Sequence, residues 1–378
     1  MSKPLAGVSV VECSTMITGP LAGMMLADLG AEVIKVENPE GGDPFRSFRG
    51  SKYSPYFFSY NRSKRSIALD LRSEKDGEVF KKLIARADVM IENFRPGVLD
   101  RLGLGTATLR EINPRLVACS ITGFGKSGPY SDRPAYDAVA QALSGISSLM
   151  FHQEPQITGP TIADNLTGIF ACYGILAALM ERERTGVART VEVNMLDATI
   201  AFMPDPFLIT TLLGVKAGPF MRAQASQSYA LACSDGRILA VHLSSQEKFW
   251  KGCLDAFEIP GLAADPRFDD RAKRVDNYLE LADTLRPIVA QKPRDYWGAR
   301  LTERDVPWAP VHSILETMDD PQVAHLQTFA QLTHPEIGPY TAVRRPVTFD
   351  GTRDDQPLSV PPELNADGPA ILKELGLA

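Results

Sequence analysis

The stretch that decides the fold is GPTIADNLTGIFACYGILAALMERERTGVARTVEVNMLDA, residues 159–198. Its apolar residues recur at helical spacing, and Thr185-Gly186 is typical of a helix C-terminus before a strand over 190–193. Asp164 stands where this helix begins. We interpret it as an N-cap whose carboxylate accepts backbone N–H bonds, faces the positive end of the helix dipole and stays ionised. The apolar stripe comprises Leu166, Ile169, Phe170, Tyr173, Leu176, Ala177 and Met180.

Two interpretations of Asp164 follow from this position. Aspartate is a preferred N-cap residue, so capping alone explains why it stands there. A permanently charged carboxylate at the start of a helix is also a well-placed nucleophile or base. From position alone, capping is the better explanation.

The first two hundred residues alternate short β-branched runs with helical patterns, which predicts a parallel sheet and an α/β fold. Proline in the first turn of the first expected helix agrees with this interpretation. The expected strands are 8–11, 31–36, 89–92, 116–121 and 190–193, and the expected helices include 20–29 and 77–86.

The second half of the chain has a different pattern. From 202 to 228 the periodicity fades while proline and glycine accumulate, which predicts a linker. Residues 229–243 predict a hairpin that turns at Ser234-Asp235-Gly236. Helical patterns fill most of 245–326 with interruptions at Pro260, Pro287, Pro307 and Pro310, strand-like runs return over 333–349, and 369–377 predicts a terminal helix.

Composition excludes several classes of protein. The net charge of −6 provides no basic stripe for nucleic acid. No apolar run reaches about 18 residues without polar breaks, and the N-terminus lacks an export signature, so we expect neither a membrane span nor secretion. The 5 cysteines and 5 histidines are dispersed, which predicts neither a disulfide framework nor a metal site. We therefore expect a cytoplasmic protein without a metal.

Three further motifs carry candidate binding residues. In NRSKRSIALDL (61–71), Arg62, Lys64 and Arg65 form a basic cluster before a strand; it is either a solvated turn or a site for phosphates. In ENFRPGVLDRLGL (92–104), Asn93 and Phe94 end a strand, where α/β folds place ligands. The third motif, residues 120–145, combines Gly123, Gly125 and Gly128 in a loop with Tyr136 and Asp137 at the start of a helix.

The N-terminal strand, turn, helix and second strand ending at Glu37 are also similar to a nicotinamide dinucleotide fold, in which an acidic residue contacts the ribose. The turn, TGPLAG, lacks the G-x-G-x-x-G fingerprint, and Pro20 occupies it. A dinucleotide-dependent dehydrogenase therefore remains only a remote alternative.

Taken together, these motifs resemble the family III CoA transferases, the group of formyl-CoA transferase. The family pattern around the long helix has an aspartate, an Ala-Ala-Leu helix end, an Arg-x-x-Thr-Gly turn and a strand closing on Asp-Ala. The basic cluster and ENF-x-P-G are also similar to the family's CoA site. The matching residues are Asp164, Ala177-Ala178-Leu179, Arg182, Thr185-Gly186 and Asp197-Ala198.

The resemblance covers nearly the whole chain and implies its organisation. Its members have a Rossmann-like large domain built from both chain ends, a small α+β domain, and two chains interlocked as a homodimer. The implied divisions are 1–200 for the N-terminal part of the large domain, 201–228 for a linker, 229–326 for the small domain, and 327–378 for a linker and return to the large domain.

The resemblance also implies an activity: CoA moves from an acyl-CoA to a small carboxylic acid, with the thioester as substrate and no permanently bound cofactor. Asp164 is then the nucleophile that carries an aspartyl-CoA thioester, and Tyr136 contacts the substrate. The residues implied to bind CoA are Asn93, Phe94, Val98, Arg101, Lys64 and Arg65.

The chain departs from the family in several places. Formyl-CoA transferase has glutamine at Ile17 and arginine at Asn38, which puts oxalate chemistry in doubt, and the glycine-rich loop of several transferases is missing. The racemase branch carries histidine at Tyr136; tyrosine, with a pKa near 10, is a poor second base. An acyl-CoA racemase or other CoA-ester proton-transfer enzyme remains the alternative, and a catalytically silent CoA-binding protein a further one.

Overall fold

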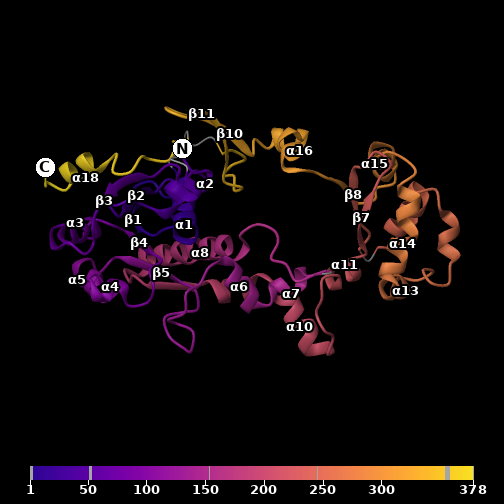
Figure 1. Cartoon of the computed structure of the whole chain (residues 1–378), viewed down its shortest axis with the longest axis horizontal. Coiled ribbons are helices and arrows are strands. Elements are labelled where there is room, and N and C mark those ends of the chain that lie inside the picture. The colour runs from indigo at the N-terminus through magenta and orange to yellow at the C-terminus, as the bar shows by residue number, and fades with distance from the viewer. Residues whose placement is uncertain (1–2, 51–52, 153, 245, 354–357, 378) are drawn as a thin grey trace. The chain divides into compact units, whose positions relative to one another are not determined.

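A parallel sheet of six strands organises the first of two units, which comprises Met1–Ser147, Gln156–Pro206 and Gln327–Ala378 (Figure 1). The computed structural model describes residues 3–50, 53–152, 154–244, 246–353 and 358–377. The strand order β3-β2-β1-β4-β5-β6 confirms the predicted α/β sheet. The strands are β1 Ser9–Cys13, β2 Glu32–Glu37, β3 Arg65–Ala68, β4 Val89–Glu92, β5 Val117–Thr122 and β6 Thr190–Asn194.

This order is that of doubly wound folds, in which successive strands are added to one side and then to the other. The direction reverses between β1 and β4, which pair in parallel from Val10 opposite Val89 to Cys13 opposite Glu92. In such sheets, ligands bind outside the carboxyl ends of the strands at the point of reversal. The fold therefore directs attention to the loops that follow β1, β4 and β5.

Helices cover both faces of the sheet. Helices α1 (Thr18–Asp28) and α8 (Ile162–Thr185) pack with β1, β4 and β5 on one face. Helices α3 (Glu74–Ile84), α5 (Thr106–Ile112) and α18 (Gly368–Glu374) pack on the other. The shorter elements of this unit are η1 Pro44–Gly50, α2 Pro55–Asn61, α4 Val98–Arg101, α6 Asp137–Ser144, α9 Met195–Phe202 and the hairpin β10 Phe329–His334 with β11 Gly338–Val343; α7 Ile146–Met150 and α10 Pro204–Leu213 cross the boundary with the second unit.

Helix α8 buries a face other than the apolar stripe that its sequence shows. Its buried residues include Ala171, Cys172 and Ile175, whereas Tyr173 and Met180 are 70% and 72% exposed. Small residues explain this choice, because a Cβ added to Gly168 would lie 2.8 Å from the Thr18 carbonyl oxygen of α1. The helix places its small face against α1 and leaves larger apolar side chains outside.

Helix α8 is also long and apolar enough to cross a membrane by length and composition, which the sequence did not lead us to expect. It packs against α1, β5, β6 and α9 within the first unit. Those contacts are the ones that a core helix makes.

The second unit, Ser148–Pro155 with Phe207–Leu326, contains an antiparallel sheet in the order β7-β8-β9. Strands β7 (Ser228–Ala232) and β8 (Ile238–His242) form the predicted hairpin. Strand β9 (Trp308–Val311) was not predicted, because Pro307 before it and Pro310 within it were interpreted as breaks between helices; an edge strand tolerates a proline. The remaining elements are α11 Met221–Ser226, α12 Glu247–Ala256, η2 Pro260–Ala264, α13 Arg271–Asp276, α14 Tyr278–Val289, α15 Arg294–Glu303, α16 Ile314–Asp319 and α17 Pro321–His325.

The stretch 202–228 is more regular than predicted. It contains helices α10 and α11. Pro204 and Pro206 stand in the first turn of α10, where the missing backbone N–H costs nothing. The prolines that predicted a linker therefore stand at the start of a helix within that segment.

Candidate active site at the carboxyl edge of the sheet

A cavity of about 370 Å³ lies at the carboxyl edge of the parallel sheet and is called here the Asp164 cavity. The loops that follow β1, β4 and β5 form much of its lining, together with the beginnings of α6 and α8. Four of the residues that the sequence singled out meet in this cavity, although they come from distant parts of the chain. They are Asn93, Phe94, Tyr136 and Asp164.

Asn93 holds the loop between β1 and α1 rather than leaving its amide open. Its side-chain oxygen accepts the Thr15 N–H at 3.0 Å, and its amide nitrogen donates to the Thr15 carbonyl at 2.8 Å and to the Thr18 hydroxyl at 3.1 Å. This loop lines the Asp164 cavity from Thr15 to Thr18. Asn93 therefore fixes one wall of the cavity.

Asp43 also holds the loop between β1 and α1. Its carboxylate accepts the N–H of Met16 at 3.1 Å and that of Phe45 at 2.9 Å. Met16 has a φ of 69°, a left-handed conformation that a non-glycine residue adopts only when its surroundings enforce it. Lys35, 3.0 Å from Asp43, joins this carboxylate to a fully buried network of charges.

The centre of that network is Glu12 on β1. Its carboxylate oxygens lie 2.9 Å from the Lys35 ammonium and 2.7 Å from that of Lys64. Burial raises the pKa of the Glu12 carboxyl, but the two lysines outweigh burial and leave the pKa below its ordinary value. Burial lowers the pKa of Lys64 to about 8. These charges satisfy one another inside the protein.

Asp164 has the opposite environment. The helix begins at Ile162 with Thr161 as the N-cap residue, so the predicted capping role of Asp164 is wrong. The Asp164 backbone N–H is instead accepted by the Asp137 carboxylate at 3.1 Å. Burial, and then the charge of Asp137, raise the pKa of Asp164 from 3.8 to about 7. The expectation of a permanently ionised carboxylate is corrected, because burial and the nearby Asp137 both favour the protonated form.

Tyr136 and the glycine loop after β5 form another part of the lining of the Asp164 cavity. Tyr136 is the N-cap residue of α6 and is 66% exposed. Gly123 follows β5, and an added Cβ there would lie 2.2 Å from the Ala135 side chain. Glycine at position 123 thus lets the two loops approach closely enough to share the cavity.

A second cavity of about 400 Å³, called here the Arg72 cavity, shares Thr15, Pro44 and Phe94 with the first. It extends over the ends of β1, β2 and β3 and includes Val98 from the predicted CoA site. Arg72 is its cation and pairs with Asp70 at 2.8 Å. The two cavities are therefore neighbours along the carboxyl edge of the sheet, and this pair is called here the path.

The basic cluster does not meet this path. Lys64 is buried, and its ammonium donates to the Pro20 carbonyl at 2.8 Å and to the Asn61 side chain at 2.9 Å. Arg65 pairs with Glu374 of α18 at 2.7 Å. The side chains expected to serve CoA are thus engaged within the protein, where they join β3 to its neighbours.

Arg101 also lies apart from the described lining. It ends α4, and a Cβ added to Gly97 would lie 3.2 Å from its guanidinium. Its side chain is exposed beside the turn that precedes the helix. Arg101 borders the ENF-x-P-G segment without lining either cavity in the described part of the chain.

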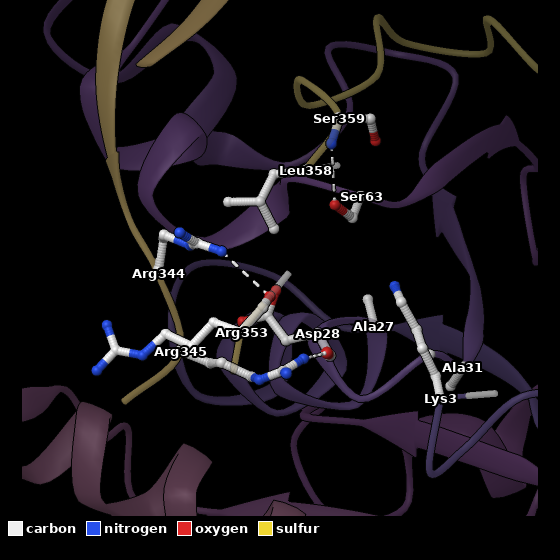
Figure 2. A pocket seen from close by; sticks show the side chains of 11 residues that line it. Lys3, Ala27, Asp28, Ala31, Ser63, Arg344, Arg345, Arg353, Leu358 and Ser359 are labelled. Carbon is white, nitrogen blue, oxygen red and sulfur yellow. Dashed lines mark hydrogen bonds between the residues drawn. The ribbon is translucent and has the colours of Figure 1, made fainter. Parts of the chain in front are cut away.

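A separate cavity of about 280 Å³ lies at the amino edge of the sheet, where β2 begins (Figure 2). Arg345 donates to the Asp28 carbonyl at 2.6 Å and Arg344 to the Arg353 carbonyl at 3.1 Å. No residue proposed from the sequence lines this cavity, and its edge is the one that doubly wound folds do not use for catalysis. Its charged lining is Lys3, Asp28, Arg344, Arg345 and Arg353.

Several residues that line or support the cavities were not identified from the sequence. Asp43, which lines the Arg72 cavity, and the buried Lys35 that pairs with it belong to no motif, and only the structure shows their role. Arg133 lines the Asp164 cavity, but it stands in a loop where charge alone gave no signal. Among the described residues, no group of three or more histidine, cysteine, aspartate or glutamate side chains is placed to hold a metal.

Comparisons with known proteins agree with this geometry. The chain matches the sequence profile of CoA-transferase family III over residues 5–368. It is 33% identical to acetyl-CoA:oxalate CoA-transferase from Acetobacter aceti, covering 98% of this chain and 95% of that protein. It is 33% identical to succinyl-CoA:glutarate CoA-transferase from Mus musculus, covering 99% and 86%.

Solved structures give the same result. A CaiB/BaiF family protein from Brucella suis is 34% identical, with a TM-score of 0.85 over 99% of this chain and 100% of that one. A hypothetical protein from Mycobacterium tuberculosis is 32% identical, with a TM-score of 0.86 over 98% and 99%. From its full-length profile match and these relatives, the chain belongs to CoA-transferase family III and is a CoA transferase.

Proposed function

We propose that this enzyme moves CoA from an acyl-CoA to a small carboxylic acid through a thioester on Asp164. One observation carries the proposal. Asp164, which forms no ion pair within the described part of the chain, lies in a cavity at the carboxyl edge of the sheet, where burial and then the charge of Asp137 raise its pKa to about 7. A carboxylate in that environment is more basic and less solvated than an exposed one, which suits a nucleophile.

The reaction consists of balanced exchanges. The Asp164 carboxylate attacks the thioester carbonyl, which expels CoA thiolate and forms a mixed anhydride. The thiolate then attacks the aspartyl carbonyl, which releases the donor acid and leaves aspartyl-CoA. An acceptor carboxylate attacks this thioester, and the expelled thiolate attacks the acceptor's acyl carbonyl, which regenerates Asp164. Each step replaces one acyl bond by another.

CoA would lie along the path between the two cavities. We place its thioester in the Asp164 cavity and its remaining length over Phe94 and Val98 toward Arg72, the cation of the second cavity. Arg101 and Asn93 flank this path, as the family resemblance implies. Contacts from Lys64 or Arg65 would first require their present ion pairs to break.

Oxyanions form at two carbonyls during these exchanges and need hydrogen-bond donors. Helix α1 begins beside the Asp164 cavity, and its N-cap residue, Ile17, provides no side-chain cap. Backbone N–H groups at the start of α1 and in the loop around Gly123 are therefore the donors that we assign to this task. Tyr136 is assigned a contact with the substrate.

The alternative of a racemase receives less support. Tyr136 occupies the position of the second base, and Asp137, the acid nearest Asp164, accepts the Asp164 N–H and the Gln141 amide. A racemase would exchange the α-proton of an acyl-CoA with solvent in the absence of any acceptor acid. A dehydrogenase would reduce NAD, and a silent binding protein would show neither reaction.

We also propose that two chains assemble as an interlocked homodimer. On α8, Ile169, Tyr173 and Met180 are 45%, 70% and 72% exposed, and large apolar side chains gathered on one exposed helix are typical of an interface. Light scattering at assay concentration tests this assembly, and a monomer there would contradict it. The five cysteines are buried free thiols, which suits the reducing cytoplasm that we propose as the location.

The transfer itself is tested by incubating the protein with pairs of acyl-CoA and carboxylic acid and following both thioesters by mass spectrometry. We expect a new acyl-CoA only when an acceptor acid is present, and only with Asp164 intact. Rapid hydrolysis that no added acid diverts would contradict a transferase.

A further inference from the structure

The basic cluster at 61–65 contains two cations that are buried rather than solvated. Arg62 and Lys64 are 4% and 5% exposed, and each contacts helix α1. Ser63 stands between them in a left-handed conformation, with a φ of 61°, and its N–H donates to the Ser359 carbonyl at 3.2 Å. The Arg62 guanidinium pairs with the carboxylate of Asp28, the last residue of α1. Arg62 thus anchors the C-terminal end of this helix.

Lys64 anchors the other end of the same helix. Its ammonium donates to the carbonyl of Pro20, in the first turn of α1, at 2.8 Å. It also donates to the Asn61 side chain at 2.9 Å and lies 2.7 Å from the Glu12 carboxylate of β1. Because Pro20 and Asp28 are about 12 Å apart along the helix axis, the two anchors act at separate ends.

Helix α1 packs directly on these buried charges through two glycines. A Cβ added at Gly23 would overlap the Glu12 carboxylate, and one added at Gly19 would overlap the Ser14 side chain. Lys35 donates to the Ser14 carbonyl at 2.8 Å and to Glu12 at 2.9 Å. The two lysines therefore hold backbone carbonyls of the loop after β1 and of the first turn of α1.

The first turn of α1 also borders the Asp164 cavity, which Thr18 helps to line. The N–H groups at the start of a helix have no intrahelical acceptor, and in α1 they include those of Thr18 and Gly19. Donors of this kind stabilise an oxyanion only when they are fixed before the reaction begins. A contact that fixes the first turn therefore acts on the rate of transfer.

We propose that Lys64 is a positioning residue for the transfer. Through the Pro20 carbonyl it sets the first turn of α1, and with it the backbone N–H groups that stabilise the oxyanions beside Asp164. Arg62 anchors the far end of the helix and has no part in the reaction. This inference rests on the proposed transfer function, and it assigns Lys64 to α1 in place of CoA.

Single-turnover kinetics test this role, because a rate constant does not depend on how much of the enzyme is folded. Excess enzyme and succinyl-CoA with a radioactive acyl group, without an acceptor acid, should release labelled succinate as aspartyl-CoA forms. We expect Lys64→Met to lower the rate constant of this release about 10- to 100-fold, the effect of a small displacement in a reacting site. The affinity for the thioester, obtained by varying the enzyme concentration, should stay almost unchanged.

Arg62→Met is the matched control, since it removes a buried cation from the same cluster and the same helix. Both substitutions should lower the midpoint of thermal unfolding, because each leaves a buried carboxylate short of a partner. Only Lys64→Met should slow the release of succinate.

A double variant separates stability from positioning. Glu12→Gln combined with Lys64→Met removes both charges of a buried pair and leaves Lys35 with Asp43, so the midpoint should partly recover. The slow release of succinate should persist, because the Pro20 carbonyl still lacks its donor.

Four results would overturn the assignment. They are a parental rate constant in Lys64→Met, an equal loss of rate in Arg62→Met, recovery of rate together with stability in the double variant, and weaker thioester binding at an unchanged rate constant, as a CoA contact predicts. If the parent enzyme itself released no succinate, the proposed transfer function would fail together with the inference.

Discussion

Two carboxylates of the first unit, Glu12 on β1 and Asp164 on α8, are shielded from water in opposite electrostatic surroundings. Glu12 is fully buried between two lysines, and their charges outweigh burial and lower its pKa. Asp164 has an aspartate as its charged neighbour, and burial raises its pKa to about 7. The first carboxylate has its charge matched, and the second does not.

The difference separates architecture from chemistry. A buried carboxylate that is paired with two cations fixes the position of its neighbours, but the cations make it a poor nucleophile. A carboxylate that lacks such partners is costly to keep and is found where a reaction uses it. The network around Glu12 includes Lys35, which pairs with Asp43, and Asp43 holds the loop that forms one wall of the Asp164 cavity. The paired charges therefore help to fix the surroundings of Asp164.

The largest effect is expected from Asp164→Asn, which keeps the shape of the side chain but removes the nucleophile. Transfer should fall by about 10³-fold or more, since an amide cannot form the covalent intermediate. Steady-state rates measure this loss, and circular dichroism checks the fold. Turnover near that of the parent enzyme would show that another group is the nucleophile.

The next effect concerns the paired charges. Lys35→Met leaves Glu12 and Asp43 without a shared cation in the interior, so unfolding should become easier by about 3–5 kcal/mol. Chemical denaturation measures this change. Lys248→Met is the control, because its pair with Asp305 is mostly exposed and should contribute no more than about 1 kcal/mol.

A smaller effect should follow from Asp43→Asn. This change weakens the hold on the Met16 N–H and the pairing with Lys35, so we expect kcat/KM to fall about tenfold with modest loss of stability. Met16→Gly relieves the left-handed strain at this position. If the loop is what matters, the double variant should recover part of the activity; a purely additive result would assign Asp43 a structural role only.

The pH dependence should distinguish the two carboxylates. With a pKa of about 7, Asp164 is mostly protonated at pH 6 and mostly ionised at pH 8, so kcat/KM should rise about tenfold across that interval. Asp137→Asn removes a negative charge and should move the midpoint to lower pH. A profile that is flat from pH 5 upward would mean that Asp164 is ionised throughout.

Stability should show the same titration with its own sign. The folded chain holds the Asp164 proton from pH 3.8 to about 7, where the unfolded chain has released it. The stabilisation that this proton provides is complete below the unfolded pKa and is lost as pH rises through the folded one. The stability of Asp164→Asn relative to the parent should therefore increase with pH over this window.

The sequence predicted the elements of the sheet better than their packing. The strand over 89–92 was placed with its observed bounds, because a short β-branched run between turns has few alternatives. The sequence identified an apolar stripe on α8, but the helix buries another face, on which the small residues Gly168 and Ala171 allow close packing. Hydrophobicity alone cannot choose between two faces when one of them is covered by another helix through small side chains.

The sequence likewise predicted some features of the site and not others. Asp164, Tyr136, Asn93 and Phe94 could be proposed from local motifs, and the structure gathers them in one cavity. The pKa of Asp164 could not be predicted, because it depends on burial and on a neighbour 27 positions away in the chain. The charges of the basic cluster were visible in the sequence, but the acids that pair with them come from distant segments.

Trapping the covalent intermediate tests the central claim most directly. The enzyme would be incubated with an acyl-CoA that it turns over, hydroxylamine would then be added, and the digested protein would be mapped by mass spectrometry. Hydroxylamine attacks anhydrides and thioesters, so we predict a hydroxamate on Asp164 that forms only in the presence of acyl-CoA. An unmodified Asp164 during turnover, or a hydroxamate on a different residue, would contradict the account.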